Sequence, residues 1–364
     1  MTKEKIERKV QSSGIRYLDQ DEKDKTRSLW ESCFWEDSKE FVSYYYREKM
    51  KENRVLVKWD QDSVIAMLHR NPYQVRFGKQ QWDVDYIVGV ATRNDRRREG
   101  HMGELLTTCL NDMNREHMPF TFLMPVAEEI YRPFSFRFVE KKEEIFLKDK
   151  VEKEIEYRSI SKSNQECRAA SLWMMQWMER HYEMSTVRGK SYLRKLIREL
   201  ESENGKMEYL IHQGVVIGIQ AFWGLNEREK RIMYLEEEWC VKGGKKPRIM
   251  ARITDIISFL PSFCLWKPGK LILELELEDE QIKAHTGKYL WTITEKGSSL
   301  KEMEGNIHWE DKADGWLKAD ISQLTEWLFG YQKPEKIWKG YPDQIIKMLS
   351  QIRTVKSILL DEIV

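Results

Sequence analysis

A basic turn followed by two glycines is the segment of this sequence most able to do chemistry. It lies within YIVGVATRNDRRREGHMGELL, residues 86–106, where an apolar run ends at Ala91 and arginines follow. Glycine lets backbone N–H groups approach an anion, and the start of a helix offers unpaired N–H groups and a positive dipole end. The segment therefore predicts a pyrophosphate cradle at a helix start. Its expected lining is Arg96, Arg97, Arg98, Glu99, Gly100, His101, Met102 and Gly103.

The elements around this turn predict a first unit that mixes strands and helices. Three β-like runs, residues 55–59, 63–77 and 82–92, precede the turn, and a helix with one apolar face follows it. A buried strand over residues 120–126 and a short helix over 128–134, stopped by Pro133, come next. The unit closes near Phe146.

A second unit repeats this outline without the basic turn. Helices over residues 167–183 and 192–201 precede a hairpin centred on Gln213 and Gly214, and a further helix is expected from about residue 248 to 260. The last hundred residues open with KLILELELED, residues 270–279, whose alternation is typical of a strand with one wet face. Strands over residues 287–294 and 305–309 and a helix over 321–329 follow. We therefore expect three domains, over residues 1–147, 148–267 and 268–364.

Composition narrows the function classes. The chain has 364 residues and a formal net charge of +1, too balanced for a general polyanion binder, so nucleic acid is not the expected partner. Nowhere do about 18 apolar residues run unbroken, and the start, MTKEKIERKV, has no apolar core, so we expect neither a membrane span nor a secretion signal. Five scattered cysteines without metal-ligand spacing favour a cytoplasmic protein with reduced thiols and no metal.

Three motifs carry a resemblance to known families. The spacing Arg97-x-x-Gly100-x-Met102 resembles the acetyl-CoA loop of the GCN5-related N-acetyltransferases (GNAT), with Met102 in place of the usual small residue. The run IYRPFSF, residues 130–136, resembles the Tyr-x-x-Phe-Gly-Tyr/Phe box of the Eis (enhanced intracellular survival) acetyltransferases, with Ser135 in place of glycine. The run ISQLTEWLFGYQ, residues 321–332, matches the sterol-carrier segment of the same family. The resemblance covers nearly the whole chain.

This resemblance implies an α/β (α+β) fold: two GNAT domains with mixed, mostly antiparallel sheets flanked by helices, the second without a cofactor loop, and a sterol-carrier-like domain. It implies acetyl-CoA as cofactor, with the backbone of Val88, Gly89 and Val90 beside the pantetheine arm. Tyr131 would be the general acid, since a phenol with a pKa near 10 can protonate a thiolate. The α-carboxylate of Val364 would be the general base. Its ordinary pKa of about 3.5 would need raising by burial or neighbouring carboxylates.

The resemblance also implies an acceptor with a primary amine, either a cationic small molecule of the aminoglycoside class or a lysine side chain. Its expected walls are Phe34, Trp35, Glu36 and Asp37, with Asp361 and Glu362 from the tail. The same residues fit equally well a helix end with ordinary solvated charges. A homo-oligomer, commonly a hexamer, is implied as well. His69, His101 and His117 belong to none of these motifs, and we expect them to be structural or surface residues.

Two other readings stay open from the sequence. One is a silent acetyl-CoA-binding or regulatory protein of the same fold, for which Met102 and Ser135 are the relevant departures. The other treats the last domain as a lipid carrier, although Glu274, Glu276 and Glu278 give its first strand a charged face. The apolar tail SILLDEIV, residues 357–364, predicts a docked chain end in any of these cases.

Overall fold

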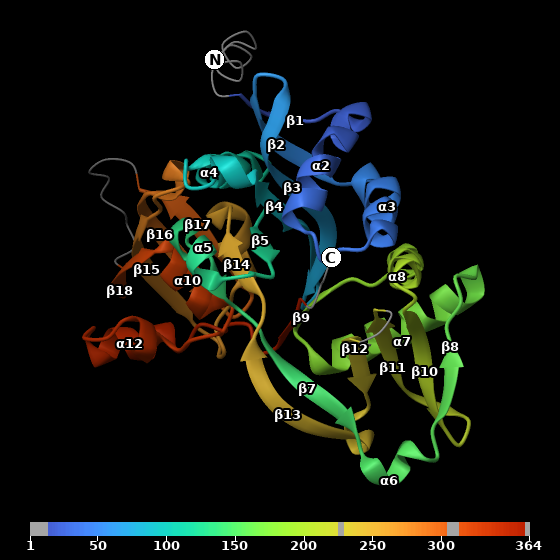
Figure 1. Ribbon diagram of the computed structural model, residues 1–364. Helices are drawn as coiled ribbons and strands as arrows, with labels where there is room; N and C mark the ends of the chain where they lie inside the picture. The colour runs from blue at the N-terminus through green and yellow to red at the C-terminus, as the bar shows by residue number, and fades with distance from the viewer. Residues whose placement is uncertain (1–13, 225–228, 304–312, 361–364) are drawn as a thin grey trace.

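The computed structural model describes residues 14–224, 229–303 and 313–360. It confirms the α/β class, with three units (Figure 1). The first unit contains the curved central sheet, and the second and third units adjoin it. The residue limits expected for the three domains stay predictions, because strands from distant parts of the chain enter this sheet. No helix in the described ranges is both long and apolar enough to span a membrane.

The central sheet has the order β1-β2-β3-β4-β5-β14-β6, and β9 joins it beside β3 while β19 pairs with β9. All neighbours along the main order are antiparallel except β4 and β5. The strands are β1 (Ile15–Tyr17), β2 (Arg54–Asp60), β3 (Ser63–Phe77), β4 (Gln80–Thr92), β5 (Phe120–Leu123), β6 (Arg137–Phe138), β9 (Met184–Thr186), β14 (Met250–Ile253) and β19 (Ile358–Leu359).

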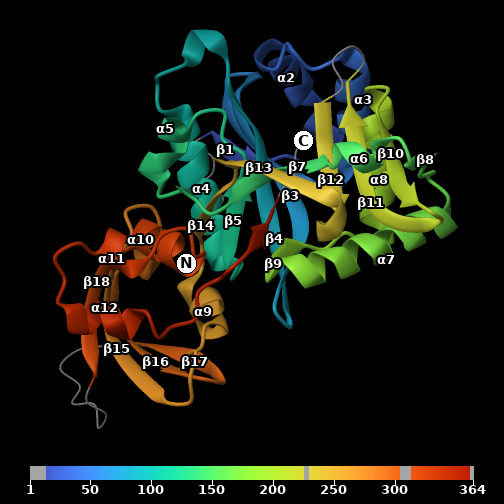
Figure 2. The ribbon, with the colours of Figure 1, turned by 90° about the horizontal axis from the view of Figure 1, so that it is seen from below.

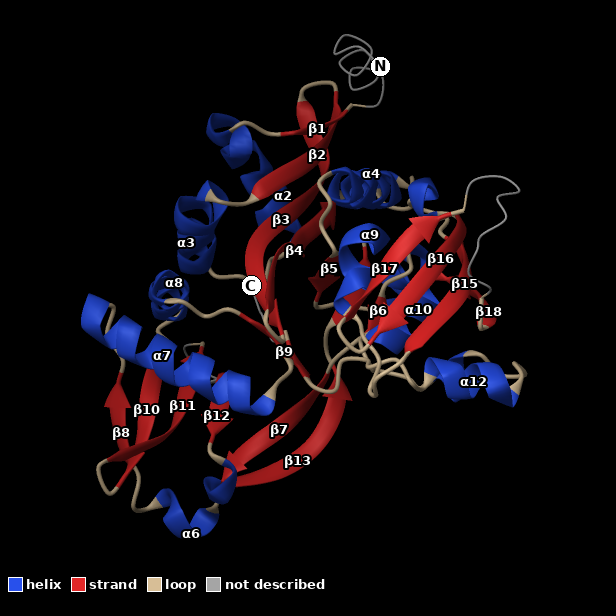
Figure 3. Cartoon of the chain, turned by 180° about the vertical axis from the view of Figure 1, so that it is seen from behind, coloured by secondary structure: helices blue, strands red, loops and turns tan. Residues whose placement is uncertain are grey.

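Helices cover both faces of this sheet. One face holds α2 (Arg27–Cys33) and α3 (Lys39–Glu48), and the other holds α4 (His101–Arg115), as Figure 3 shows from behind. Helix α4 forms where the sequence predicts it, because Leu105, Cys109 and Met113 recur at four-residue steps and are fully buried. The N-cap of α3 is Ser38, whose side chain accepts a hydrogen bond from the Phe41 N–H.

The helix predicted over residues 248–260 is wrong. Residues Met250–Ile253 form β14, which lies between β5 and β6, and only Ile256–Phe259 are helical, as α9. All four residues of β14 are buried, so they show no periodicity that would separate a strand from a helix. Asp255 then caps α9 by accepting the Ile257 N–H.

The second unit is a smaller sheet of order β12-β11-β10-β8 with α7 and α8 packed on it. Its elements are α7 (Asn164–His181), α8 (Lys190–Ser202), β8 (Glu156–Ser159), β10 (Lys206–His212), β11 (Val215–Trp223) and β12 (Glu229–Leu235). The predicted hairpin turn at Gln213 and Gly214 is confirmed, and both residues have positive φ. A two-stranded ribbon of β7 (Lys141–Leu147) and β13 (Cys240–Pro247) joins this unit to the central sheet (Figure 3).

The third unit packs a sheet of order β17-β16-β15-β18 against α10 (Ile321–Leu328), at the opposite side from the second unit (Figure 2). Its strands are β15 (Lys270–Glu278), β16 (Gly287–Thr294), β17 (Gly297–Glu302) and β18 (Gly315–Asp320). Along β15 the leucines are buried while Glu276 pairs with Lys318 at 3.1 Å, so the predicted wet face is confirmed. The strand expected over residues 305–309 lies outside the described residues.

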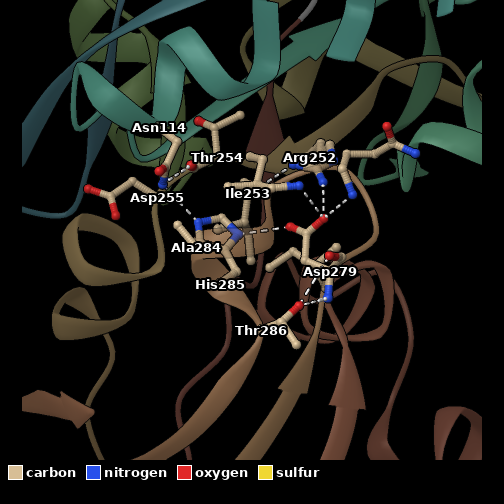
Figure 4. Close-up of polar contacts among 12 residues, drawn as sticks. Asn114, Arg252, Ile253, Thr254, Asp255, Asp279, Ala284, His285 and Thr286 are labelled. Carbon is tan, nitrogen blue, oxygen red and sulfur yellow. Dashed lines mark hydrogen bonds and ion pairs between the residues drawn. The ribbon is translucent and has the colours of Figure 1, made fainter. Parts of the chain in front are cut away.

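A buried polar clamp holds the third unit to the central sheet (Figure 4). Arg252 of β14 donates to Asp279 at 2.6 Å, and neither side chain is exposed. His285 donates from Nδ1 to the same carboxylate at 2.8 Å, and its Nε2 lies 3.0 Å from the Asn114 amide of α4. Burial raises the pKa of Asp279, but the His285 hydrogen bond and the Arg252 charge outweigh this effect and keep that pKa below its usual value.

Candidate functional site

The central sheet is open between β4 and β5. These parallel strands share a single residue pair, Tyr86 with Phe122, and β4 then continues to Thr92 with only β3 beside it among the described strands. The backbone groups of residues 87–92 on the open side therefore lack a neighbouring strand. An extended chain with amide groups, such as a pantetheine arm, could bond to them as an added strand does.

A bulge at Gly89 shapes this opening. The register between β3 and β4 shifts there, and Gly89 has a φ of +60°. A Cβ at this position would lie 2.6 Å from Cζ3 of Trp30 and 3.1 Å from Nδ1 of His69. Only glycine meets both demands, and the bulge changes the direction of the backbone groups at Val88 and Val90.

The predicted phosphate loop leads from β4 into α4. Gly100 is the N-cap residue, with a φ of +87° and open space where a Cβ would point, and no side chain caps the helix. The first N–H groups of α4, at His101, Met102 and Gly103, are therefore available to an anion. Met102 packs its side chain among the buried residues beneath the helix, so its bulk is turned away from the solvent side.

The arginines of this loop are not equivalent. Arg96 already binds Asp60 and, at 2.9 Å, Glu99, and it lowers the pKa of both carboxyl groups. Glu99 also lies 3.0 Å from Nε2 of His101. Arg97 and Arg98 are exposed and form no ion pair with any residue that the structure describes. They are the cations left for an incoming phosphate.

Tyr131 lies close to α4. It ends α5 (Glu128–Tyr131), and Phe134, three residues later, would touch a Cβ on Gly103 at 3.3 Å. Burial raises the pKa of Tyr131 to about 12, and its hydroxyl makes no hydrogen bond within the described part of the chain. Ser135 takes a left-handed φ of 63°, the conformation that a glycine would adopt more easily. The segment after Tyr131 thus reaches Gly103 through Phe134, and Tyr131 itself packs in the buried cluster that contains Leu105 and Leu106 of α4.

The four residues expected to line the acceptor pocket separate into two pairs. Asp37 accepts a hydrogen bond from Nε1 of Trp30 at 2.8 Å, and the Phe34 ring lies 4.8 Å from the Trp30 ring. Because Trp30 packs on Gly89, both residues belong to the wall beside the bulge. Burial raises the pKa of Asp37. Trp35 and Glu36 are exposed, Trp35 to 77%.

A buried aromatic layer around His69 and Tyr45 lies beside the bulge and was not predicted from the sequence. His69 is fully buried, its Nδ1 lies 3.0 Å from the Tyr45 hydroxyl, and Asn53 donates to that hydroxyl at 2.9 Å. Burial lowers the pKa of His69 to about 3, so the ring is neutral, as expected for a structural histidine. Its Nε2 has no hydrogen-bond partner among the described residues. The only sequence signal was a histidine inside the apolar run SVIAMLH.

The tail is docked as far as it is described. β19 pairs in parallel with β9, Leu359 and Leu360 are buried, and the Leu360 N–H donates to Glu140 Oε2 at 2.8 Å. Since β9 pairs with β3, the tail joins the sheet that contains the bulge. Asp361, Glu362 and Val364 lie outside the described residues. Within the part of the chain that the structure describes, no group of three or more His, Cys, Asp or Glu is placed to hold a metal ion.

Two parts of the sequence match known domain families. Residues 14–139 match the acetyltransferase (GNAT) domain, and residues 263–338 match the sterol carrier protein domain. The first match spans the open sheet, the loop and Tyr131. No curated protein matches the sequence.

Solved structures share the fold over nearly the full length. A probable N-acyltransferase of unknown function from Enterococcus faecalis has 15% identity and a TM-score of 0.76, covering 96% of this chain and 98% of its own. A GCN5-related N-acetyltransferase from Anabaena variabilis has 15% identity and a TM-score of 0.73, covering 95% and 99%. Eis1 from Mycobacterium abscessus has 11% identity and a TM-score of 0.69, covering 96% and 99%.

The fold and the site together define the class of protein. The first unit is an acetyltransferase domain of the GNAT type, and the chain is an acetyltransferase by virtue of it. The third unit carries a sterol carrier protein domain.

Proposed function

We propose that the protein transfers the acetyl group of acetyl-CoA directly to a primary amine, on a cationic small molecule or a lysine side chain, as the Eis-like enzymes do. The observation that supports this most is the position of Tyr131. The residue belongs to the same buried cluster as Leu105 and Leu106 of α4, the helix whose start forms the predicted phosphate cradle, and its hydroxyl is uncommitted within the described residues. We expect a homo-oligomer, commonly a hexamer.

The residues around the opening fit acetyl-CoA. The open N–H groups after Gly100, with Arg97 and Arg98 nearby, would hold the pyrophosphate, and the unpaired edge of β4 would hold the pantetheine arm. Acetyl-CoA supplies a thioester carbonyl that an amine can attack and a thiolate that can leave. A backbone N–H near Gly89 would stabilise the negative charge that develops on the carbonyl oxygen.

Two proton transfers complete the reaction. Tyr131 would donate its proton to the leaving thiolate, and with a pKa of about 12 it stays protonated throughout the working range of pH. The α-carboxylate of Val364 would accept the proton of the amine, directly or through water. The pairing of β19 with β9, which in turn pairs with β3, supports this role, since it joins the described tail, as far as Leu360, to the central sheet.

A silent binding protein of the same fold is the alternative, and the two sequence departures give it little support. Met102 packs inward, so it leaves the loop N–H groups accessible. Ser135 adopts the left-handed conformation of the glycine that it replaces.

The test is acetyl-CoA titration by calorimetry together with thiol release, using aminoglycosides, polyamines and lysine peptides as acceptors. Tyr131→Phe and removal of residues 362–364 should each lower kcat about 100-fold or more, because one proton transfer is lost, while the acetyl-CoA Kd changes less than about twofold. Tyr157→Phe, at a half-exposed tyrosine of the second unit, is the matched control and should change neither quantity. Unchanged turnover in both site variants would contradict the assignment.

A further inference from the structure

A large cavity begins where β5 ends. It has a volume of about 980 Å³, and its walls include Met124, which directly follows β5, together with the β7–β13 ribbon and Leu359 of the tail strand. A smaller cavity of about 190 Å³ lies against β3, with Asn71 and Tyr73 in its wall. Arg231 of β12 lines both cavities. This arginine therefore lies between the wall at β3 and the large cavity, the space in which an acceptor could lie.

The large cavity is basic. Eight lysine and arginine side chains line it, against four glutamates. Ion pairs cancel part of this charge on the ribbon, where Lys245 binds Glu143 at 3.2 Å and Lys246 binds Glu144 at 3.3 Å. The remaining excess is positive, which does not suit an acceptor whose only charges are cationic.

Two arginines in this cavity lack a good anionic partner. The Arg231 side chain is only 16% exposed, and the carboxylate nearest to it in the described residues, that of Glu229, lies 3.5 Å from Nε. This Nε makes no hydrogen bond to a described residue, and the guanidinium lies 4.5 Å from the centre of the Trp223 ring. Arg248 lines the same cavity, and its buried Nε likewise has no hydrogen-bond partner in the described chain.

Two buried arginines without good anionic partners lower the stability of the fold unless a ligand supplies the missing negative charge. Burial lowers the pKa of Arg231, and the positive charge of Arg248 acts in the same direction. Buried polar groups are almost always hydrogen-bonded, and a guanidinium presents N–H groups in a fork that matches a carboxylate or a phosphate. The two side chains together form a prepared anion site in the wall of the large cavity.

We infer that the acceptor carries an anionic group, a carboxylate or a phosphate, in addition to its amine, and that Arg231 and Arg248 bind this group. The inference rests on the proposed acetyl transfer and narrows its acceptor to amines that also bear an anion. The anion would lie in the cavity while the amine faces the opening near Gly89. A free lysine or another amino acid has this chemistry, and a polycationic aminoglycoside does not.

The test compares two acceptors that differ only in the anion. Nα-acetyl-lysine and its methylamide carry the same side-chain amine, and their binding to the full chain with CoA present is measured by calorimetry. We expect the carboxylate to bind at least tenfold tighter. In Arg231→Met and in Arg248→Met this preference should fall below about twofold. Lys245→Met, which removes a lysine already paired with Glu143, should leave the preference unchanged.

Further arms separate the possible outcomes. Acetyl-CoA binding checks that each variant folds, and Arg231→Lys, which keeps the charge without the fork, should retain part of the preference if Arg231→Met does not fold. Phosphoethanolamine against ethanolamine shows whether the site takes phosphate. Thiol release is recorded separately, so that a carboxylate preference without release contradicts the proposed transfer and leaves the anion site supported.

Three results would overturn the inference. In the first, the wild type binds neither lysine compound, and in the second, it binds the carboxylate no more tightly than the methylamide. The third result is a carboxylate preference that persists in both Arg231→Met and Arg248→Met. Removal of residues 361–364 provides a last check. If that removal creates a carboxylate preference that the full chain lacks, then the tail carboxylates, and not the acceptor, are the partners of these arginines.

Discussion

The first and second units contain sheets of related outline, but only the first sheet is open. In the central sheet, β4 and β5 run parallel and share one residue pair. In the second unit, β12, β11, β10 and β8 are antiparallel throughout and paired along most of their length. The second sheet therefore has no gap in which a pantetheine arm could lie.

One glycine in each sheet illustrates the same difference between the first and second units. Gly89 of β4 has a positive φ and forms the bulge at the opening. Gly218 of β11 pairs with Leu210 and Leu235 in antiparallel ladders, next to a register shift in the first of them, and a Cβ there would come within 2.5 Å of the Leu235 side chain and the Tyr234 carbonyl oxygen. Gly89 shapes the proposed cofactor site, and Gly218 permits close packing of β11 against β12. The two sheets therefore differ at the proposed cofactor site, where the first has both a parallel neighbour and a bulge with a glycine at positive φ.

The largest expected effect comes from Gly89→Ala. The new Cβ would strike Trp30 and the residue would keep an unfavourable positive φ, which together cost about 3 kcal/mol or more, so the bulge should flatten. We expect acetyl-CoA affinity to fall about 100-fold, as measured by calorimetry. Gly218→Ala should lower the free energy of unfolding by about 1–3 kcal/mol and leave the acetyl-CoA Kd within about twofold. Equal loss of affinity in both variants would contradict the comparison.

The clamp at Asp279 provides the next test, because it joins the central sheet to the third unit and includes no residue of the second sheet. Asp279→Asn leaves the buried Arg252 without a counter-charge, which should cost about 3–5 kcal/mol. Hydrogen exchange should quicken in residues 250–253 and 120–123 and stay unchanged in residues 207–223. The double variant Arg252→Met with Asp279→Leu should lose less stability, since no buried charge remains. Uniformly faster exchange in both sheets would show that the clamp is not local to the first.

The wild-type clamp should also depend on pH. The folded-state pKa of Asp279 is below its ordinary value of about 3.9, so its contribution to stability is complete above that pH. The contribution is lost as the pH falls through the lowered folded value.

The smallest expected effect comes from Gly100→Ala. Nothing lies within 4 Å of the new Cβ, so the change adds only the strain of a φ of +87°, about 1–2 kcal/mol. The acetyl-CoA Kd should rise roughly five- to tenfold as the loop relaxes. Gly214→Ala is the matched control, because that hairpin glycine of the second unit has a φ of +78° and the same open surroundings. It should leave the Kd unchanged. A lower acetyl-CoA Kd in Gly100→Ala than in the wild type would show that the loop geometry does not serve cofactor binding.

The sequence by itself determined the features that local interactions control. The three-part order of elements, the helix after the basic turn, the hairpin at Gln213 and Gly214 and the alternation along β15 all follow from residue spacing and turn chemistry. The resemblance of the Arg97-x-x-Gly100-x-Met102 loop to the GNAT acetyltransferases is confirmed by the domain match over residues 14–139. These features depend on neighbours within a few residues along the chain.

Only the tertiary structure decided which strands meet. Residues 250–253 form a strand because β5 and β6 lie on either side of them, and their apolar run carries no sign of those partners. The gap after Tyr86, the contact of Trp30 with Gly89 and the place of Arg231 between two cavities join residues far apart in sequence. Such contacts come from the packing of whole units, because burial and charge at one position depend on side chains that no local pattern specifies.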